Sequence, residues 1–309
     1  MKQTFAVIVV VILSVVGFFY WKNSNIKNVL CVTKSIAPSL AINRVFGNKE
    51  AIDKWMPEGA KNIGEKEFLV NDCKVKIGQV GEEYNVISIN ANNVTYKSLL
   101  QIQTDKGESE LSFDFKLPDS LSFFERIKIK NKIQNCGNDI LKTLTNYLQV
   151  QKNIYGIGFA KSHVTDSTLI SYKDNSNEYP SIDRIYKNID ILFAYSKLNN
   201  AKLTNAPMLN IYKNGVNDYD FTVALPIDKF LLNSAGIIAK RMLYGGNQII
   251  SDTIIGNRGK IDNFLKEIDY YKNDNLLISP AIPFESLITD RRLELDSNKW
   301  KTKLYVPIF

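Results

Sequence analysis

The residue whose type and setting most suggest chemistry is Glu285, an acid inside an apolar segment that resembles a strand. It belongs to residues 283–308, which read Pro-Phe-Glu-Ser-Leu-Ile, a polar turn, and Lys-Thr-Lys-Leu-Tyr-Val-Pro-Ile. Residues 207–227 repeat this order, and Leu209 stands there in the place of the acid. A carboxylate among apolar groups is costly unless it is paired. It therefore binds a cation, or its pKa rises and it becomes a proton donor.

Glu285 also has a structural interpretation, as a strand residue that faces solvent and pairs with Arg291 or Arg292. Other residues offer less chemistry. His163 is the only histidine, and no cysteine or serine motif lies near it. The cysteines are odd in number and widely spaced, which favours neither a disulfide framework nor a zinc site; they are Cys31, Cys73 and Cys136. We expect no metal and no cofactor, because the chain has no glycine-rich phosphate loop and no metal-spaced cluster.

The echo between the two segments predicts a duplicated unit that positions Glu285. Each copy follows a segment with helical character, so the expected unit is βαββ. The first copy is expected to have a strand over 157–170, a helix over 178–200 and strands over 207–212 and 219–227. The second is expected to have a strand over 236–243, a helix over about 257–272 and strands over 284–289 and 300–308. Two such copies would form one domain with a shared cleft.

The amino terminus predicts a membrane anchor. Residues 5–21 carry no charge and would span about 25 Å as a helix, near the short end for a transmembrane segment. The aromatic cluster at residues 18–21 suits a membrane interface and makes a poor cleavage site for a signal peptide. Cys31 lies too far along for a lipoprotein signal. We therefore expect an uncleaved transmembrane signal-anchor over residues 1–22, in a bacterial inner membrane, with the soluble domains outside the cytoplasm.

The net charge of +7 invites a nucleic-acid interpretation. The basic residues, however, are spread along the chain, and the densest patch, residues 128–132, is short. Nucleic-acid binders usually show a concentrated stripe or a docking motif. We therefore expect no nucleic-acid partner.

Residues 28–151 predict a separate domain of strands and one long helix. A strand over 29–36 is followed by two short helices and then by alternating, strand-like runs. These runs are 67–70, 74–80, 84–89, 94–103 and 109–117. Residues 121–151 then predict a long helix, because Ile133, Cys136, Ile140 and Leu144 recur at three- and four-residue steps. Gly137 interrupts this pattern.

This order resembles the helix-grip fold of the START/polyketide-cyclase (SRPBCC) superfamily. The resemblance rests on Thr-Lys-Ser-Ile-Ala-Pro-Ser at 33–39, on the stretch from Phe46 to Trp55-Met56-Pro57, and on the final helix. It implies a cavity that the long helix closes over a curved sheet. The alternative is that the apolar faces form a solid core.

Residues 154–309 contain four motifs in order: Ala-Leu-Pro-Ile at 224–227, Tyr-Gly-Gly at 244–246, Phe-Glu opening the strand at 284, and Leu-Tyr-Val-Pro-Ile at 304–308. In these motifs the segment resembles the GyrI-like effector-binding domain, which is also the ligand-binding part of AraC- and MerR-type regulators. The resemblance implies a lipophilic, often cationic, ligand held around a buried glutamate. Leu287 departs from the family pattern, which has tyrosine there.

Carried onto this chain, the resemblance makes Glu285 the central acid and Tyr305 and Tyr244 aromatic wall residues; Tyr212 and Trp300 are further candidates for ligand contact. The overall expectation is an α+β protein: one transmembrane helix, an SRPBCC-like domain at 28–151 and a duplicated βαββ domain at 154–309. It would bind a lipophilic or amphipathic, in the family often cationic, small molecule. The alternative is a hydrolase of lipophilic electrophiles, with Glu285 as general acid/base.

Overall fold

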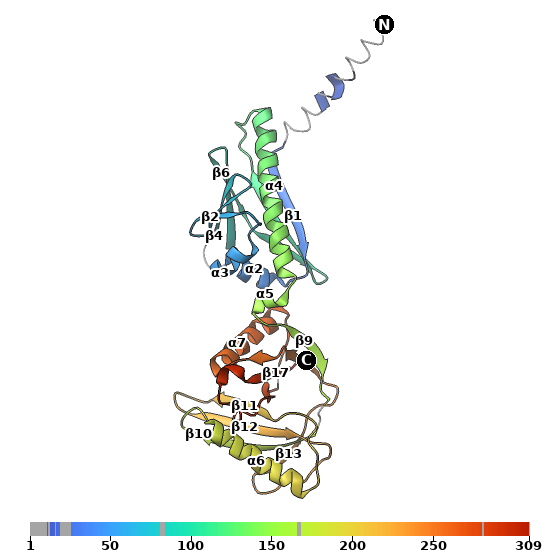
Figure 1. Cartoon of the computed structure of the whole chain (residues 1–309). Helices are drawn as coiled ribbons and strands as arrows, with labels where there is room; N and C mark the ends of the chain where they lie inside the picture. Colours follow the sequence, from blue (N-terminus) through green and yellow to red (C-terminus); the bar gives the residue numbers. More distant parts are fainter. Residues whose placement is uncertain are drawn as a thin grey trace. The chain divides into compact units, whose positions relative to one another are not determined.

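The computed structural model describes residues 11, 13–15, 17–18, 26–80, 84–165, 168–279 and 281–308. These residues form an α+β protein in which the paired strands of each sheet are antiparallel. They divide into two compact units, Met1–Ile154 and Tyr155–Phe309, called unit 1 and unit 2 below (Figure 1).

The membrane anchor needs correction. In the part of the chain that the structure describes, no helix is long and apolar enough to cross a membrane. Most of the predicted span at 5–21, and most of the anchor predicted over 1–22, lies outside the described residues. The absence of such a helix contradicts two predictions: a single-pass protein in a bacterial inner membrane, and a membrane contact through residues 5–21. No membrane span is assigned.

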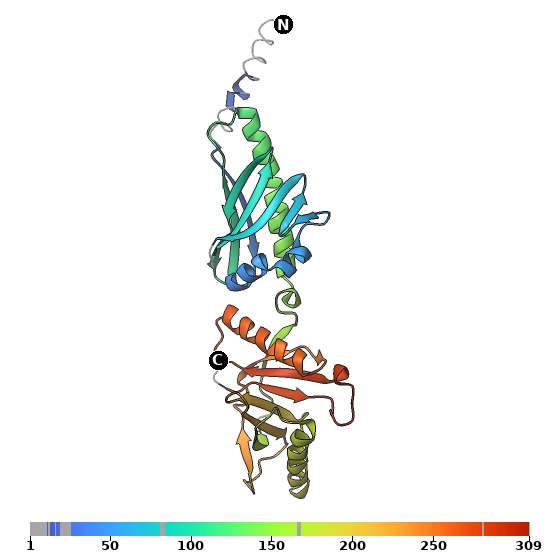
Figure 2. The same ribbon diagram turned by 90° about the vertical axis from the view of Figure 1, so that its left-hand side faces the viewer.

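Unit 1 packs one long helix against antiparallel strands. Helix α4 (Phe123–Leu148) runs along β1 (Asn28–Ser35), which pairs with β8 (Glu108–Lys116) (Figures 1 and 2). Two short helices follow β1: α2 (Ser39–Gly47) and α3 (Lys49–Trp55). The other strands are β2 (Lys61–Gly64), β3 (Glu67–Val70), β4 (Cys73–Val80), β5 (Tyr84–Ala91), β6 (Val94–Leu99) and β7 (Gln101–Asp105).

The strands of unit 1 form two sheets, with orders β1-β8-β7 and β2-β3-β4-β5-β6. The element order is the one that the sequence predicts, with two differences. The sequence did not predict β2. The expected strand over 94–103 is two strands, β6 and β7, which belong to different sheets. It breaks at Leu100, whose side chain is buried and whose amide donates to the carbonyl of Asn85.

Helix α4 begins at a capping box. The Ser122 side chain and the Glu125 carboxylate each satisfy an amide of the first turn that has no partner within the helix. Its buried side chains, among them Ile133 and Ile140, join one continuous apolar cluster with the sheet. Whether unit 1 has an SRPBCC fold with a ligand cavity stays a prediction.

Unit 2 begins at Tyr155, the last residue of α5 (Gln151–Tyr155), and continues with an antiparallel sheet and two helices of equal length. The helices are α6 (Ile182–Leu198) and α7 (Arg258–Asp274). The first half of the chain of unit 2 supplies β9 (Phe159–His163), β10 (Thr168–Ser176), β11 (Met208–Lys213) and β12 (Tyr219–Pro226). The second half supplies β13 (Ile237–Arg241), β14 (Asn247–Ser251), β15 (Ile254–Ile255), β16 (Phe284–Leu287), the short helix η1 (Ser297–Lys299) and β17 (Lys301–Pro307).

The strand order of unit 2 shows that the sequence echo is a structural duplication. The order is β13-β10-β12-β11-β16-β17-β14-β9. The counterparts in the two copies are β9 and β13, β10 and β14, β11 and β16, and β12 and β17. When each strand is replaced by its counterpart, the order reads the same from the opposite end. Leu209 faces Glu285 where the copies meet, between β11 and β16. These two residues are separated by 76 positions, and so are the N-caps of α6 and α7, Ser181 and Asn257.

The repeating unit is larger than the predicted βαββ unit. Each copy is ββαββ, and its first strand pairs with the other copy: β9 pairs with β14, and β13 pairs with β10. The sequence prediction assigned only one strand, over 236–243, before the second helix. The structure has two, β13 and β14, separated by a short turn that contains Gly245 with a φ of +75°. The predicted strand covers β13 and misses β14, which is only five residues long.

Side chains on the central strands alternate between two faces. On one face Leu209, Phe221 and Leu287 belong to a core that includes the buried side of α6. On the same face the first residue of α7, Arg258, meets Glu285. Helices α6 and α7 lie beside the two halves of the sheet (Figures 1 and 2). The other face, which includes Met208 and Phe284, is the one that carries the site described below.

Candidate functional site

The open face of the unit 2 sheet contains two adjoining hollows, called together the sheet groove. The larger has a volume of about 210 Å³ and the smaller about 90 Å³, and Met208, Met242 and Phe284 line both. The larger hollow is lined by Leu169, Ser171, Met208, Leu209, Asn210, Thr222, Ala224, Lys240, Met242, Ala281, Ile282, Phe284 and Pro307. The smaller is lined by Ser162, His163, Val164, Thr165, Asn205, Met208, Met242, Gln248, Ile250, Phe284, Ser286 and Tyr305.

An aromatic pair stands where the two hollows meet. Phe284 on β16 is opposite Tyr305 on β17, and their rings stack at 5.0 Å between centroids and 3° between planes. Cross-strand aromatic pairs of this kind stabilise a sheet and fix the position of both rings. Met208 and Met242 complete the shared wall. Their unbranched thioether side chains can adjust to ligands of different shape.

The larger hollow contains four polar residues. The Ser171 hydroxyl donates to the carbonyl of Ile238 at 3.1 Å, and the Asn210 amide donates to the carbonyl of Pro283 at 2.8 Å. The other two are Thr222 and Lys240, and the described residues give neither side chain a hydrogen bond or ion pair. Lys240 is also exposed. Among the described residues that line the sheet groove, Lys240 alone carries a formal charge at neutral pH with histidine counted as neutral.

Glu285 does not line the sheet groove. Because it directly opposes Leu209 and follows Phe284 on the same strand, its side chain lies on the helix-covered face. It is 4% exposed. One carboxylate oxygen accepts from Arg258 and the other from Arg291, the latter at 3.1 Å. Both oxygens of the acid are therefore engaged by guanidinium groups.

The two arginines extend this contact into a network, called here the Glu285 cluster. Arg291 is 5% exposed, donates to the Thr302 hydroxyl at 3.0 Å and lies 4.9 Å from the centre of the Trp300 ring. Arg258 pairs with Asp262 at 2.6 Å. The cluster joins the start of α7 and the loop after β16 to the central strands. A carboxylate between two arginines is the paired form in which a buried charge is tolerated.

The structure separates the other residues that the sequence singled out. Tyr305 lines the smaller hollow. Trp300 is buried in the Glu285 cluster, where its indole donates to the carbonyl of Glu294 at 2.8 Å. Tyr244 and Tyr212 are 74% and 64% exposed and line neither hollow.

Sequence reasoning missed Met208, Met242, Phe284 and Lys240 as groove residues. The alternation of β11 and β16 carried the signal, since Met208 and Phe284 are adjacent to Leu209 and Glu285 and must face the other way. The sequence could not show which face of the sheet the helices cover. Among the described residues, no group of histidine, cysteine, aspartate and glutamate could hold a metal ion.

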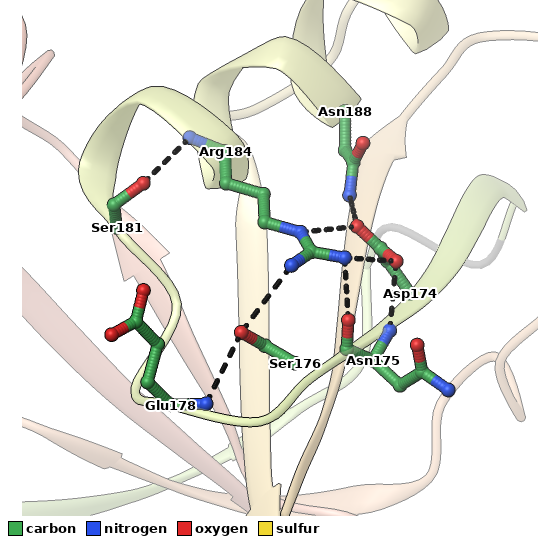
Figure 3. A network of polar contacts seen from close by, with 7 residues as sticks. All are labelled: Asp174, Asn175, Ser176, Glu178, Ser181, Arg184 and Asn188. Carbon is green, nitrogen blue, oxygen red and sulfur yellow. Dashed lines mark hydrogen bonds and ion pairs between the residues drawn. The ribbon is translucent and has the colours of Figure 1, made fainter.

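Behind the sheet groove, a polar network fixes the start of α6 to the end of β10 (Figure 3). Arg184 donates to both carboxylate oxygens of Asp174, at 3.0 Å each, and to the carbonyl of Asn175. Asn188 donates to Asp174, and the Ser181 hydroxyl caps the helix by accepting from the Arg184 amide. The hydrogen bonds from Arg184 lower the pKa of Asp174, although partial burial opposes the shift. The network holds the start of α6 against the end of β10.

No family model and no curated protein sequence matches the chain. Solved structures do. EcmrR in an EcmrR–DNA complex is 19% identical at a TM-score of 0.44, over 62% of this chain and 72% of that one. The EcmrR C-terminal domain is 18% identical at a TM-score of 0.42, over 50% and 98%. A conserved protein from Listeria innocua is 10% identical at a TM-score of 0.39, over 49% and 92%.

The duplication of unit 2 is shown by its strand order, independently of these likenesses. The likenesses require a correction. The expectation of no nucleic-acid partner is contradicted, because one similar structure is of a protein in complex with DNA. The exclusion based on charge distribution is therefore withdrawn.

Proposed function

We propose that unit 2 binds a lipophilic or amphipathic small molecule in the sheet groove. The observation that carries the proposal is the larger hollow itself. Nine of its thirteen lining residues are apolar, and it lies on the sheet face opposite α6 and the Glu285 cluster. Concave, mostly apolar sites with a few polar groups are the usual form of a small-molecule site.

Binding would rest on apolar burial, which contributes about 25 cal/mol per Å² of apolar surface removed from water. The fixed Phe284–Tyr305 pair offers a rigid surface for a ring or chain, and Met208 and Met242 can adapt to its outline. Tyr305 is thus retained as a proposed contact residue.

The role expected for Glu285 changes in this proposal. A carboxylate bound to Arg258 and Arg291 on the other side of the sheet supports the groove indirectly, by anchoring the central strand. The same geometry gives no support to the alternative hydrolase, in which Glu285 would need to reach the ligand as general acid/base. No observation on the described residues favours that second function.

The test uses the whole chain and Nile red, an uncharged dye whose emission rises in apolar surroundings. Thr222 is partly exposed in the groove, so Thr222→Trp should fill the larger hollow without removing a core side chain. We expect it to weaken dye binding at least tenfold. The matched control is Ala194→Trp, on an exposed position of α6, which should bind as the parent chain does. Equal binding by both variants would refute the groove as the site.

A further inference from the structure

We infer that the sheet groove selects anionic amphipathic ligands, such as aromatic or aliphatic carboxylates, over cationic ones of the same shape. This inference rests on the proposed function, because it names the ligand class of the same groove. It also runs against the cationic preference implied by the family resemblance.

A cationic ligand would need an acid in the groove, but none of the aspartates and glutamates that the structure describes lines either hollow. Glu285, which follows Phe284 of the groove on β16, lies on the helix-covered face with both oxygens bonded to arginines. A cation in the groove would therefore lose hydration without gaining a carboxylate partner among the described residues.

The groove does contain a positive charge. Lys240, on β13, lines the larger hollow, and no ion pair or hydrogen bond of the described residues involves its side chain. An ammonium group beside an apolar hollow suits a ligand with an apolar body and an anionic end. The Thr222 hydroxyl, on β12 in the same hollow, is a second donor without a partner among the described residues.

Lys240 differs in its setting from the next residue of β13. Its neighbour Arg241 does not line the groove, and its guanidinium lies 4.8 Å from the centre of the Phe230 ring. The two basic residues of β13 therefore have different roles, one open to the groove and one packed on an aromatic ring. This difference supplies a control that removes the same net charge from the chain.

The experiment measures three ligands with one apolar body, naphthoate, naphthylmethanol and naphthylmethylammonium, by displacement of Nile red from the whole chain at low salt. We expect naphthoate to bind about fivefold or more tightly than naphthylmethylammonium, a modest ratio because Lys240 is exposed to solvent. The preference should shrink as salt is raised.

Three variants separate the effect of Lys240 on ligand preference from the effect of the overall positive charge of the chain. Lys240→Met should bring the naphthoate and naphthylmethylammonium affinities to within about twofold, and Lys240→Glu should reverse their order. Arg241→Met loses the same charge and should keep the preference of the parent chain. An unchanged preference in Lys240→Met would overturn the assignment of Lys240.

The failure of this inference is distinct from that of the proposed function. If naphthylmethylammonium bound as tightly as naphthoate, and Thr222→Trp weakened both, the groove would be a site without anion selectivity, and the inference would be wrong. If Thr222→Trp left both dye binding and displacement unchanged, the groove would not be the site and both statements would fall. If none of the three ligands displaced the dye while Thr222→Trp still weakened dye binding, the inference alone would fall.

Discussion

At the scale of single residues, Glu285 shows how a chemically suggestive side chain can have a structural role. Its 4% exposure and two guanidinium partners give it the environment of a buried ion network. Removing one member of such a network leaves the others charged and unpaired. The penalty is large because the remaining groups cannot regain their hydration.

We therefore predict that Glu285→Gln destabilises unit 2 by about 3–5 kcal/mol, since Arg258 and Arg291 would lose their shared partner. Urea-dependent hydrogen exchange of β16 and β17 measures this loss. Glu178→Gln, at an exposed position, is the control and should change the value by less than about 0.5 kcal/mol. Under conditions where the variant stays folded, Nile red binding should persist. Loss of binding in fully folded protein would instead return Glu285 to the ligand site.

Sequence reasoning about Glu285 was limited by what a pattern can show. The acid stood out because it interrupts an apolar strand, and Arg291 was already one of its possible partners. Arg258 could not be foreseen, because it lies 27 residues earlier at the start of α7 and meets Glu285 only through the fold. Which face of β16 the helices cover depends on the whole sheet, so the sequence could not decide between a ligand acid and a structural one.

At the scale of elements, the long helix of unit 1 depends on one close approach. Gly137 interrupts the apolar pattern of α4, and a Cβ placed there would lie 2.7 Å from the Cys31 Sγ on β1. The glycine thus allows α4 to pack closely on β1. Cys31 is fully buried, and burial raises the pKa of its thiol to about 11.

We predict that Gly137→Ala destabilises unit 1 by about 1–3 kcal/mol, because the clash outweighs the gain in helix propensity of about 1 kcal/mol. Cys31→Ala removes the opposing sulfur and should reduce the penalty. The double variant should therefore lose less stability than the two single variants added together. Urea unfolding of the four proteins measures this coupling, and simple additivity would show that the Gly137–Cys31 contact does not limit the packing.

The elements themselves were more predictable than their pairing. The periodic runs placed α4, α6 and α7 to within a few residues, since an amphipathic helix is specified locally. The prediction of a single strand over 94–103 was wrong, because the chain passes from one sheet to the other at Leu100 without a local turn signal. The exchange of β9 and β13 between the copies of unit 2 likewise had no local signal, as strand pairing is a long-range property.

At the scale of the whole molecule, acid should weaken unit 2 through its paired carboxylates. The hydrogen bonds of Asp174 with Arg184 and of Asp290 with Arg292 lower the pKa of each acid below its ordinary value. A lowered pKa in the folded state stabilises the fold above the pKa of the unfolded chain, about 3.9 for aspartate. That contribution is lost as the pH falls through the lower, folded pKa.

We therefore predict that the thermal midpoint of unit 2 is nearly constant from about pH 7 to pH 5 and falls steeply below about pH 4. Asp174→Asn should lower the midpoint at neutral pH and flatten this fall, because the variant has no charge at that position to lose. Asp218→Asn, at an exposed position without an ion pair in the described residues, should keep the steep fall. Hydrogen exchange of α6 and β10, measured as a function of pH, tests whether the loss of stability in acid arises in the network of Figure 3. An equally steep fall in Asp174→Asn would place the acid sensitivity of unit 2 in other carboxylates, Asp290 first among them.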